Sequence, residues 1–384
     1  MKVLFISHES SRTGAPLVLL SFLKWLKQNQ SDIACDLVSL KTGELREEFE
    51  NVVDSYQELL VETPEELTLI QQIKKRLKKR IGLHKPIKSK KNLLIESLKT
   101  TSFDIIYANT ALALDLAIKI KKRNPAVKVI CHIHELNTII KLKVPFFRSY
   151  IPFVDRWIAV SNLVKNNLMS NYSIPPAAIK TIYEFTGSVA PQQRISSNDS
   201  EFIVGGCGTV HWRKGTDLFL LVALYVRRNY PQLPIKFIWV GEISAEQETI
   251  MDADIKKCNI AETVELIGST ENPSYYYNQM SLFLLTSRED PFPLVAIEAG
   301  KLGKPIIAFD KASGTTEVLS DTCGSVVNYL DVEAMAEQIA FYYKNQSVLK
   351  MHGKNAKAVF DQFSPNIICT QLYDVIFKVF ETIK

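Results

Sequence analysis

Residues Lys2–Leu26 read KVLFISHESSRTGAPLVLLSFLKWL. A short apolar run, a polar turn containing a glycine and a stretch with apolar residues at helical spacing follow one another, which predicts a buried strand, a turn and a helix. The pattern recurs along the chain. Its apolar runs are continuous, as in strands that helices cover on both faces. Strands that alternate with helices predict an α/β fold with mainly parallel sheets.

The expected strands fall into two series, and 384 residues are too many for one ordinary core. Between the series, the polar segment 190–200 lacks apolar periodicity and is expected to link two domains. We therefore expect two Rossmann-like doubly wound domains, 1–190 and 200–365, facing a central cleft where a ligand binds. The strands are expected at Lys2–Ile6, Ile33–Leu40, Phe103–Ala108, Val127–Ile133 and Arg156–Val160, and at Phe202–Val204, Ile235–Val240, Val264–Ile267, Leu282–Thr286, Pro305–Phe309 and Gly324–Val327.

Composition indicates a globular protein, with 46% hydrophobic and 23% charged residues. The six cysteines are scattered, with no CxxC pair, which argues against a zinc site or a disulfide framework and fits a reducing cytoplasm. The opening residues lack the apolar run of a secretory signal, and no run reaches the roughly 20 residues that cross a bilayer. We expect a soluble or peripheral cytoplasmic protein.

A basic stretch at residues 71–91 reads QQIKKRLKKRIGLHKPIKSKK. With apolar residues at helical spacing, it is typical of a basic amphipathic helix on anionic lipid at the inner face of a membrane. A solvated surface helix is an equal alternative, and nucleic-acid binding is disfavoured because aromatic residues are not interleaved. The cations considered for the membrane are Lys74, Lys75, Arg76, Lys78, Lys79 and Arg80.

A glycine-rich turn follows the first strand of the second series, GGCGTVHWRKGTDLF at residues 205–219. The dinucleotide fingerprint fails because His211 stands where the third glycine belongs, and the Walker pattern fails because Lys214 precedes Gly215. Small residues that let the backbone approach a ligand, with Arg213 and Lys214 just before a helix, favour an anion. An ordinary strand-to-helix turn with exposed charges is the alternative.

The segment Ser287–Gly300, SREDPFPLVAIEAG, is more informative. We expect a turn through its two prolines and a helix from about Leu294, which would aim the amides of Leu294 and Val295 at a pyrophosphate. Glu298 would lie about one turn into that helix, where a carboxylate can accept hydrogen bonds from a diol such as ribose. In so apolar a helix, an unpartnered carboxylate would be costly.

This segment resembles the acidic signature of retaining glycosyltransferase family 4, which has the GT-B fold. Four further segments resemble family motifs in the right order: SRTGAPLVLLSFL, CHIHEL, IAVSNLVKNNL and GCGTVHWRKGTDLF. The resemblance implies a metal-independent hexosyltransferase without cofactor, whose partners are a nucleotide sugar and a glycan or lipid-linked acceptor of surface polysaccharide assembly. It also implies that the last helix, in 366–384, crosses back to the first, acceptor-side domain.

The resemblance also implies residue roles. Lys214, helped by Arg213, would neutralise the donor diphosphate, Glu298 would hold the ribose, and Asp290 would contact the donor sugar. The amides of Leu294, Val295 and Gly14 would face the phosphates, and His134 would orient the sugar near its anomeric carbon. Attack from the front face, with the leaving phosphate taking the acceptor's proton, would need no protein nucleophile and no metal.

The chain departs from the family pattern at three places. Asp290 replaces the commoner first glutamate, although Glu289 beside it could fill that position. Thr209 stands in the donor loop where an arginine is common, and Tyr183-Glu184-Phe185-Thr186-Gly187 replaces a usual Asn-Gly. These departures keep two alternatives open, a non-catalytic subunit that binds a partner or glycan and a sugar-nucleotide epimerase. The donor base, the sugar, the acceptor and the oligomeric state are not indicated.

Overall fold

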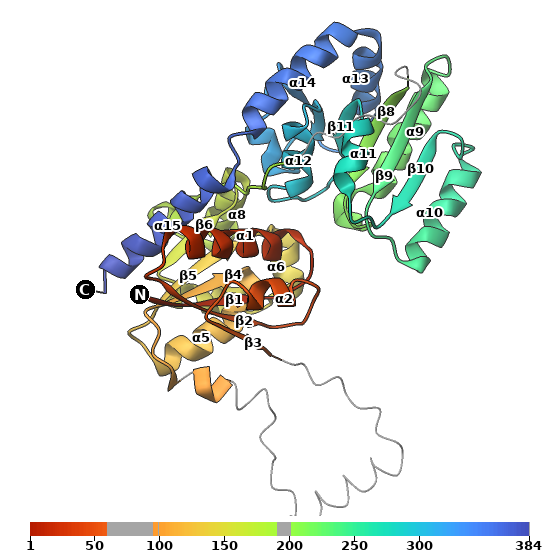
Figure 1. Ribbon diagram of the computed structural model, residues 1–384. Helices are drawn as coiled ribbons and strands as arrows, with labels where there is room; N and C mark the ends of the chain where they lie inside the picture. Colours follow the sequence, from red (N-terminus) through yellow and green to blue (C-terminus); the bar gives the residue numbers. More distant parts are fainter. Residues whose placement is uncertain (60–94, 99, 190–200, 384) are drawn as a thin grey trace, which may run out of the picture. The chain divides into compact units, whose positions relative to one another are not determined.

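The computed structural model describes residues 1–59, 95–98, 100–189 and 201–383. It contains two parallel sheets, each flanked by helices (Figure 1). By contacts, the chain divides into a first compact unit of Met1–His132, Lys143–Trp157 and Tyr373–Lys384 and a second of Ile133–Leu142 and Ile158–Leu372. The expected linker and the basic stretch lie outside the described residues, so both stay predictions.

The first sheet has seven strands in the order β3-β2-β1-β4-β5-β6-β7. Strand β1 is parallel to both of its neighbours, β2 and β4, with Val3 opposite Cys35 on one side and Ile105 on the other. The strands are β1 Lys2–Ser7, β2 Ala34–Ser39, β3 Ser55–Glu58, β4 Ile105–Asn109, β5 Lys128–Ile133, β6 Arg156–Ala159 and β7 Ile179–Thr181. The helices are α1 Gly14–Asn29, α2 Arg46–Glu50, α5 Leu114–Arg123, α6 Asn137–Lys143, α7 Phe147–Tyr150 and α8 Asn162–Tyr172, and the short 3-10 turns are Ala111–Ala113, Ile151–Phe153 and Pro176–Ala178.

The second sheet has six strands in the order β10-β9-β8-β11-β12-β13. The strands are β8 Phe202–Cys207, β9 Ile235–Val240, β10 Val264–Gly268, β11 Leu282–Leu285, β12 Ile306–Phe309 and β13 Gly324–Val327. The helices are α9 Thr216–Asn229, α10 Ala245–Lys257, α11 Pro273–Gln279, α12 Leu294–Lys301, α13 Val332–Lys344, α14 Gln346–Phe360 and α15 Pro365–Glu381, and the 3-10 turns are η4 Trp212–Lys214 and η5 Gly314–Glu317. The two series of expected strands are therefore confirmed, with ends that differ from the expected ones by at most three residues.

Continuous apolar runs become strands buried on both faces, as the pattern predicts. In β1, Val3 to Ile6 are all 0% exposed, and the ring of Phe5 packs edge-on against Phe22 of α1 at 6.3 Å between centroids. In the second sheet, Phe237 and Trp239 of β9 pack in the same way against Phe219 of α9. Edge-on aromatic contacts therefore hold α1 on the first sheet and α9 on the second.

Each sheet contains a point where the direction of the crossovers reverses. In the second sheet, the chain leaves β8 toward β9 on one side, and it leaves β11 toward β12 on the other. Because such crossovers are right-handed, α9 and α12 cover opposite faces of the sheet (Figure 1). The loops that follow β8 and β11 consequently lie together at the carboxyl ends of neighbouring strands, where ligands bind in this class of fold.

The last helix belongs partly to each unit, because α15 begins in the second and Tyr373 to its end cluster with the first. Within the first unit, the ring of Tyr373 lies 6.2 Å from that of Trp25 on α1. Among the described residues, the helices are all too short or too polar to cross a bilayer.

Candidate functional site

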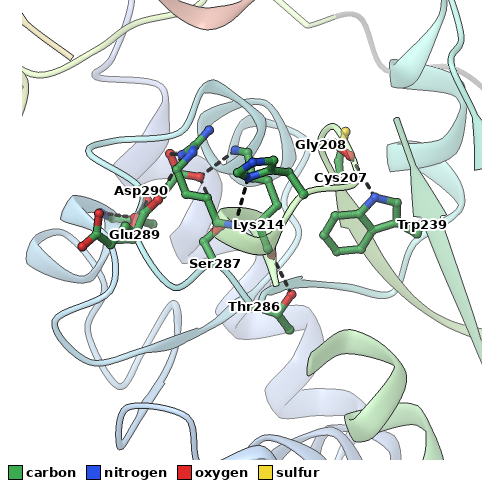
Figure 2. A network of polar contacts seen from close by, with 12 residues as sticks. Cys207, Gly208, Lys214, Trp239, Thr286, Ser287, Glu289 and Asp290 are labelled. Carbon is green, nitrogen blue, oxygen red and sulfur yellow. Dashed lines mark hydrogen bonds and ion pairs between the residues drawn. The ribbon is translucent and has the colours of Figure 1, made fainter. Parts of the chain in front are cut away.

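The loops after β8 and β11 are joined by close backbone packing. Gly215 has φ +68°, and a Cβ there would lie 2.0 Å from the carbonyl oxygen of Thr286, so only glycine fits at this crossing. The Thr286 hydroxyl donates to the carbonyl of Lys214 at 3.2 Å, and the indole of Trp239 donates to the carbonyl of Gly208 at 2.8 Å (Figure 2). The two loops therefore form one connected platform.

The glycines of the first loop serve packing and not only ligand approach. Gly205 and Gly206 lie inside β8, where a Cβ would collide with Met280 at 2.0 Å and with Trp239 at 2.6 Å. The missing side chains of these two glycines therefore make room for core residues, and the predicted approach of the turn's backbone to a ligand stays a prediction. Gly208 differs, since a Cβ there would touch the side chain of Lys214 at 3.0 Å. Its hydrogen therefore leaves a path for that lysine.

Asp290 is the centre of a cluster of charges on this platform. Its carboxylate accepts hydrogen bonds from Lys214 Nζ at 2.6 Å, from Arg213 Nη1 at 3.0 Å and from the Ser287 hydroxyl at 3.1 Å (Figure 2). Asp290 is 4% exposed, whereas the side chains of Lys214 and Arg213 are 13% and 28% exposed. Burial alone would raise the pKa of Asp290, but the two cations hold that pKa below its usual value.

The structure also separates the two adjacent acids. Glu289 turns away from the cations and accepts a hydrogen bond from the hydroxyl of Thr138 at 2.6 Å (Figure 2). Only its backbone carbonyl contacts the cluster, by accepting from Arg213 at 3.0 Å. Asp290 is thus the acid that lies with the cations.

Glu298 lies on α12, which begins at Leu294 as expected. Its Oε2 accepts a hydrogen bond from the hydroxyl of Tyr277 at 3.1 Å. Burial raises the pKa of Glu298 to about 7, although the bond from Tyr277 opposes the shift. A half-buried carboxyl group with a pKa raised this far is typical of a binding or catalytic position.

The other expected donor contacts are placed as follows. Leu294 and Val295 form the first turn of α12, where helix amides lack partners within the helix, and Pro293 before them offers no capping side chain. Thr209 is exposed on the loop after β8. Gly14 is the exposed first residue of α1 in the first unit, and its predicted phosphate contact stays a prediction.

His134 follows directly after β5 and forms a buried ion pair. Its Nδ1 lies 2.5 Å from Oε1 of Glu184, and the two side chains are 7% and 6% exposed. Burial lowers the pKa of His134, but Glu184 and then Glu135 outweigh it, so the net shift is upward. Its paired ring is therefore charged over a wider pH range than a free imidazole. Contact with the sugar stays a prediction.

Several supporting residues were not predicted. Arg288 makes a bidentate ion pair with Asp217 of α9, at 2.8 and 2.7 Å, and its guanidinium lies over the ring of Trp212. These contacts tie the loop after β11 to the turn that holds Lys214. Tyr277 and Glu184 were also missed, because no spacing in the sequence links either one to its partner.

Two family profiles together match most of the chain. The family described as Glycosyltransferase Family 4 matches residues 14–185, and the family described as Glycosyl transferases group 1 matches residues 191–359. The first match ends at residue 185, and the second begins at residue 191, inside the polar segment 190–200 where the linker was expected.

Curated relatives are similar over part of their length. The lipopolysaccharide core biosynthesis mannosyltransferase LpcC of Rhizobium leguminosarum bv. viciae is 29% identical over 161 residues, which cover 40% of this chain and 44% of LpcC. The amylovoran biosynthesis glycosyltransferase AmsD of Erwinia amylovora is 28% identical over 153 residues, which cover 40% of this chain and 43% of AmsD. The chain thus matches less than half the length of these two relatives.

The fold is shared with solved structures over the whole chain. The Anabaena protein HepE, in complex with UDP and glucose, superposes with a TM-score of 0.75 at 17% identity, covering 98% of this chain and 99% of HepE. At that identity the likeness establishes the fold, which is the expected GT-B type with two Rossmann-like parallel sheets.

Proposed function

Since the chain belongs to the GT-B glycosyltransferases of family 4, we propose that it moves a sugar from a nucleotide-sugar donor to a glycan or lipid-linked glycan acceptor. The observation that supports this most strongly is the placement of Lys214, Arg213 and Asp290 on one platform, with Glu298 on the helix that follows. LpcC and AmsD act in lipopolysaccharide core and amylovoran biosynthesis, which supports a role in surface polysaccharide assembly.

The diphosphate, the ribose and the sugar of the donor would each have a chemical partner in this arrangement. Lys214 and Arg213 would neutralise the diphosphate, whose charge grows as the glycosidic bond breaks. Glu298, in its ionised form, would accept hydrogen bonds from the two ribose hydroxyls. Asp290 would hold both cations in place and approach the donor sugar with its remaining acceptor capacity. This shared use of Asp290 extends the sequence expectation, in which the residue served the sugar alone.

The proposed reaction is a retaining transfer without metal. The bond between the anomeric carbon and the diphosphate oxygen breaks, and the acceptor hydroxyl forms the new bond on the same face of the sugar. Its proton passes to the leaving phosphate oxygen, so no protein nucleophile takes part. His134, charged through Glu184, would stand near the anomeric carbon and donate a hydrogen bond to the sugar.

A peripheral position at the inner face of the membrane is also proposed. It rests on the basic residues Lys74 to Arg80 and on the lipid-linked acceptor, since each cation near an anionic surface contributes about 1 kcal/mol. Neutralising Lys74, Lys75, Arg76, Lys78, Lys79 and Arg80 should then abolish sedimentation with vesicles containing anionic lipid. Unchanged sedimentation of the variant would refute this part of the proposal.

Transfer itself is tested with a panel of labelled UDP-, GDP-, ADP- and dTDP-sugars and a membrane extract as source of acceptor. We expect one nucleotide class to label a glycan or lipid-linked product, with the anomeric configuration of the donor retained. Lys214→Ala and Glu298→Ala should reduce labelling by roughly 100-fold or more. Donor turnover without any acceptor would instead indicate an epimerase, and unchanged labelling by both variants would exclude the site.

A further inference from the structure

A tyrosine and a cysteine form a short buried chain of hydrogen bonds behind Glu298. The hydroxyl of Tyr277 lies 3.1 Å from Oε2 of Glu298 and 3.1 Å from Sγ of Cys207. Tyr277 is 1% exposed and comes from α11, Cys207 is the last residue of β8, and Glu298 comes from α12. Three elements thus meet at one hydroxyl group.

The chemistry of the three groups determines which of them donates each hydrogen bond. A tyrosine hydroxyl has one proton to donate, and a carboxylate is a stronger acceptor than a thiol sulfur. Burial raises the pKa of the Cys207 thiol to about 11, so the thiol keeps its proton at neutral pH. The tyrosine proton therefore goes to Oε2 of Glu298, and the protonated thiol can in turn donate to the tyrosine oxygen.

These hydrogen bonds hold one carboxylate oxygen of Glu298, Oε2, and leave the other oxygen, Oε1, available to a ligand. Oε1 accepts no hydrogen bond from the described residues, and a glutamate side chain has three torsions that must be held for a defined geometry. We propose that Tyr277 is a positioning residue for the donor, which anchors Oε2 so that Oε1 meets the vicinal hydroxyl groups of the nucleotide's ribose. The inference rests on the proposed function and adds to it two residues, Tyr277 and Cys207, that do not touch the donor.

A merely structural tyrosine would behave differently. The ring of Tyr277 packs edge-on against Phe283 at 6.1 Å, and Tyr277→Phe preserves that packing. Loss of the hydroxyl then removes only the anchor and the bond that favours the ionised carboxylate. A structural role predicts lower stability with unchanged donor binding, whereas a positioning role predicts weaker binding with a changed pH dependence.

The matched control is Tyr342→Phe. Tyr342 is 0% exposed, its hydroxyl lies 3.0 Å from Nδ1 of His352, and it lies on α13 in the core of the same unit. Both variants lose one buried hydroxyl, so a comparison of their thermal melting separates loss of stability from loss of binding. Cys207→Ala tests the contribution of the contact between the Cys207 sulfur and the Tyr277 hydroxyl.

Binding is measured by calorimetry with UDP, GDP and ADP as probes, and the tightest of them is then titrated into each variant from pH 6 to 9. We expect Tyr277→Phe to bind roughly tenfold more weakly at pH 7, with a smaller difference at pH 9, where Glu298 is ionised in both proteins. Cys207→Ala should weaken binding by a smaller factor, and Tyr342→Phe should bind as the wild type does.

The outcomes separate the two proposals. If the wild type binds a nucleotide, Glu298→Ala abolishes that binding and Tyr277→Phe leaves both affinity and pH profile unchanged, the positioning role is overturned while the donor site stands. If the wild type binds none of the three probes, or Glu298→Ala binds as well as the wild type, the proposed donor site is wrong and the role of Tyr277 is overturned with it.

Discussion

The ammonium group of Lys214 lies 2.6 Å from the carboxylate of Asp290, so the cation proposed for the donor already has an anionic partner in the protein. Arg213 contacts the other oxygen of the same carboxylate at 3.0 Å. A diphosphate that binds here shares both cations with Asp290 and does not meet an isolated positive charge. The carboxylate thereby holds both cations in place, and such preorganised groups are the ones that stabilise developing charge effectively.

Replacement of Lys214 should affect the diphosphate most. Lys214→Met keeps the apolar stem beside Gly208 and removes the charge, so we expect roughly 100-fold slower transfer and much weaker nucleotide binding. Steady-state kinetics with the active donor measure both. Lys350→Met, at an exposed position of α14, is the control and should behave as the wild type. Equal kinetics for the two variants would exclude Lys214 from the donor site.

Asp290→Asn should separate nucleotide binding from transfer. Removing the negative charge frees Lys214 and Arg213 for phosphate, so we expect nucleoside diphosphate affinity to be kept or increased. Transfer should fall, because the cations lose their anchor and the sugar loses an acceptor. The fold should lose about 2 kcal/mol of stability at pH 7, since the carboxylate is a buried partner of two cations. A variant with full transfer activity would contradict the central place of Asp290.

Glu298→Gln should make the ligand-free protein more stable at neutral and higher pH, and it should weaken donor binding. The pKa of Glu298 lies at about 7 in the folded state, above its usual 4.5. Between these two pH values the folded protein holds a proton that the unfolded chain has released, so the free energy of unfolding falls as the pH rises. Glutamine avoids this loss, which amounts to about 3 kcal/mol above pH 7.

Chemical denaturation at pH 4 and pH 8 measures this effect. The variant should match the wild type at pH 4 and exceed it at pH 8. A variant less stable than the wild type at pH 8 would show that the ionised carboxylate of Glu298 does not destabilise the folded protein. Glu265→Gln, at an exposed position on β10, should leave stability unchanged at both pH values.

Glu184→Gln should reveal the charge on His134. Because the pKa of His134 is raised, the pair's contribution to stability is fully present below the usual histidine value of 6.5 and is lost as the pH rises through the raised value. We expect a loss of about 3 kcal/mol at pH 6 and a smaller loss at pH 9. Denaturation curves at the two pH values decide this. A loss that is independent of pH would mean that His134 is neutral throughout.

Most of the fold could be predicted because apolar runs report burial directly. Lys2–Ile6 and Ile235–Val240 lie within or coincide with buried strands, and Ser161 caps α8 through its side chain as a helix-initiating serine does. Strand β3, SYQE, was missed since it is polar and lies at the edge of its sheet, where half-exposed residues give no apolar signal. Strand β7 has only three residues, too few for a period.

The candidate site could be predicted in part, for a related reason. Lys214, Asp290 and Glu298 stand in loops and helix starts whose spacing indicates their chemistry. Glu184 and Tyr277 act through partners 50 and 21 residues away, His134 and Glu298, and such contacts depend on how separate elements pack. The family resemblance could not predict Glu184 either, since this residue lies where the chain departs from the family pattern.

The second unit is proposed to bind a nucleotide-sugar donor through Lys214, Asp290 and Glu298. Thermal denaturation with a panel of UDP-, GDP-, ADP- and dTDP-sugars tests it most directly. One class of nucleotide sugar, at about 100 times its dissociation constant, should stabilise the wild type by about 2.7 kcal/mol and leave Lys214→Met unchanged. Absence of stabilisation by every donor, or equal stabilisation of the two proteins, would contradict the claim.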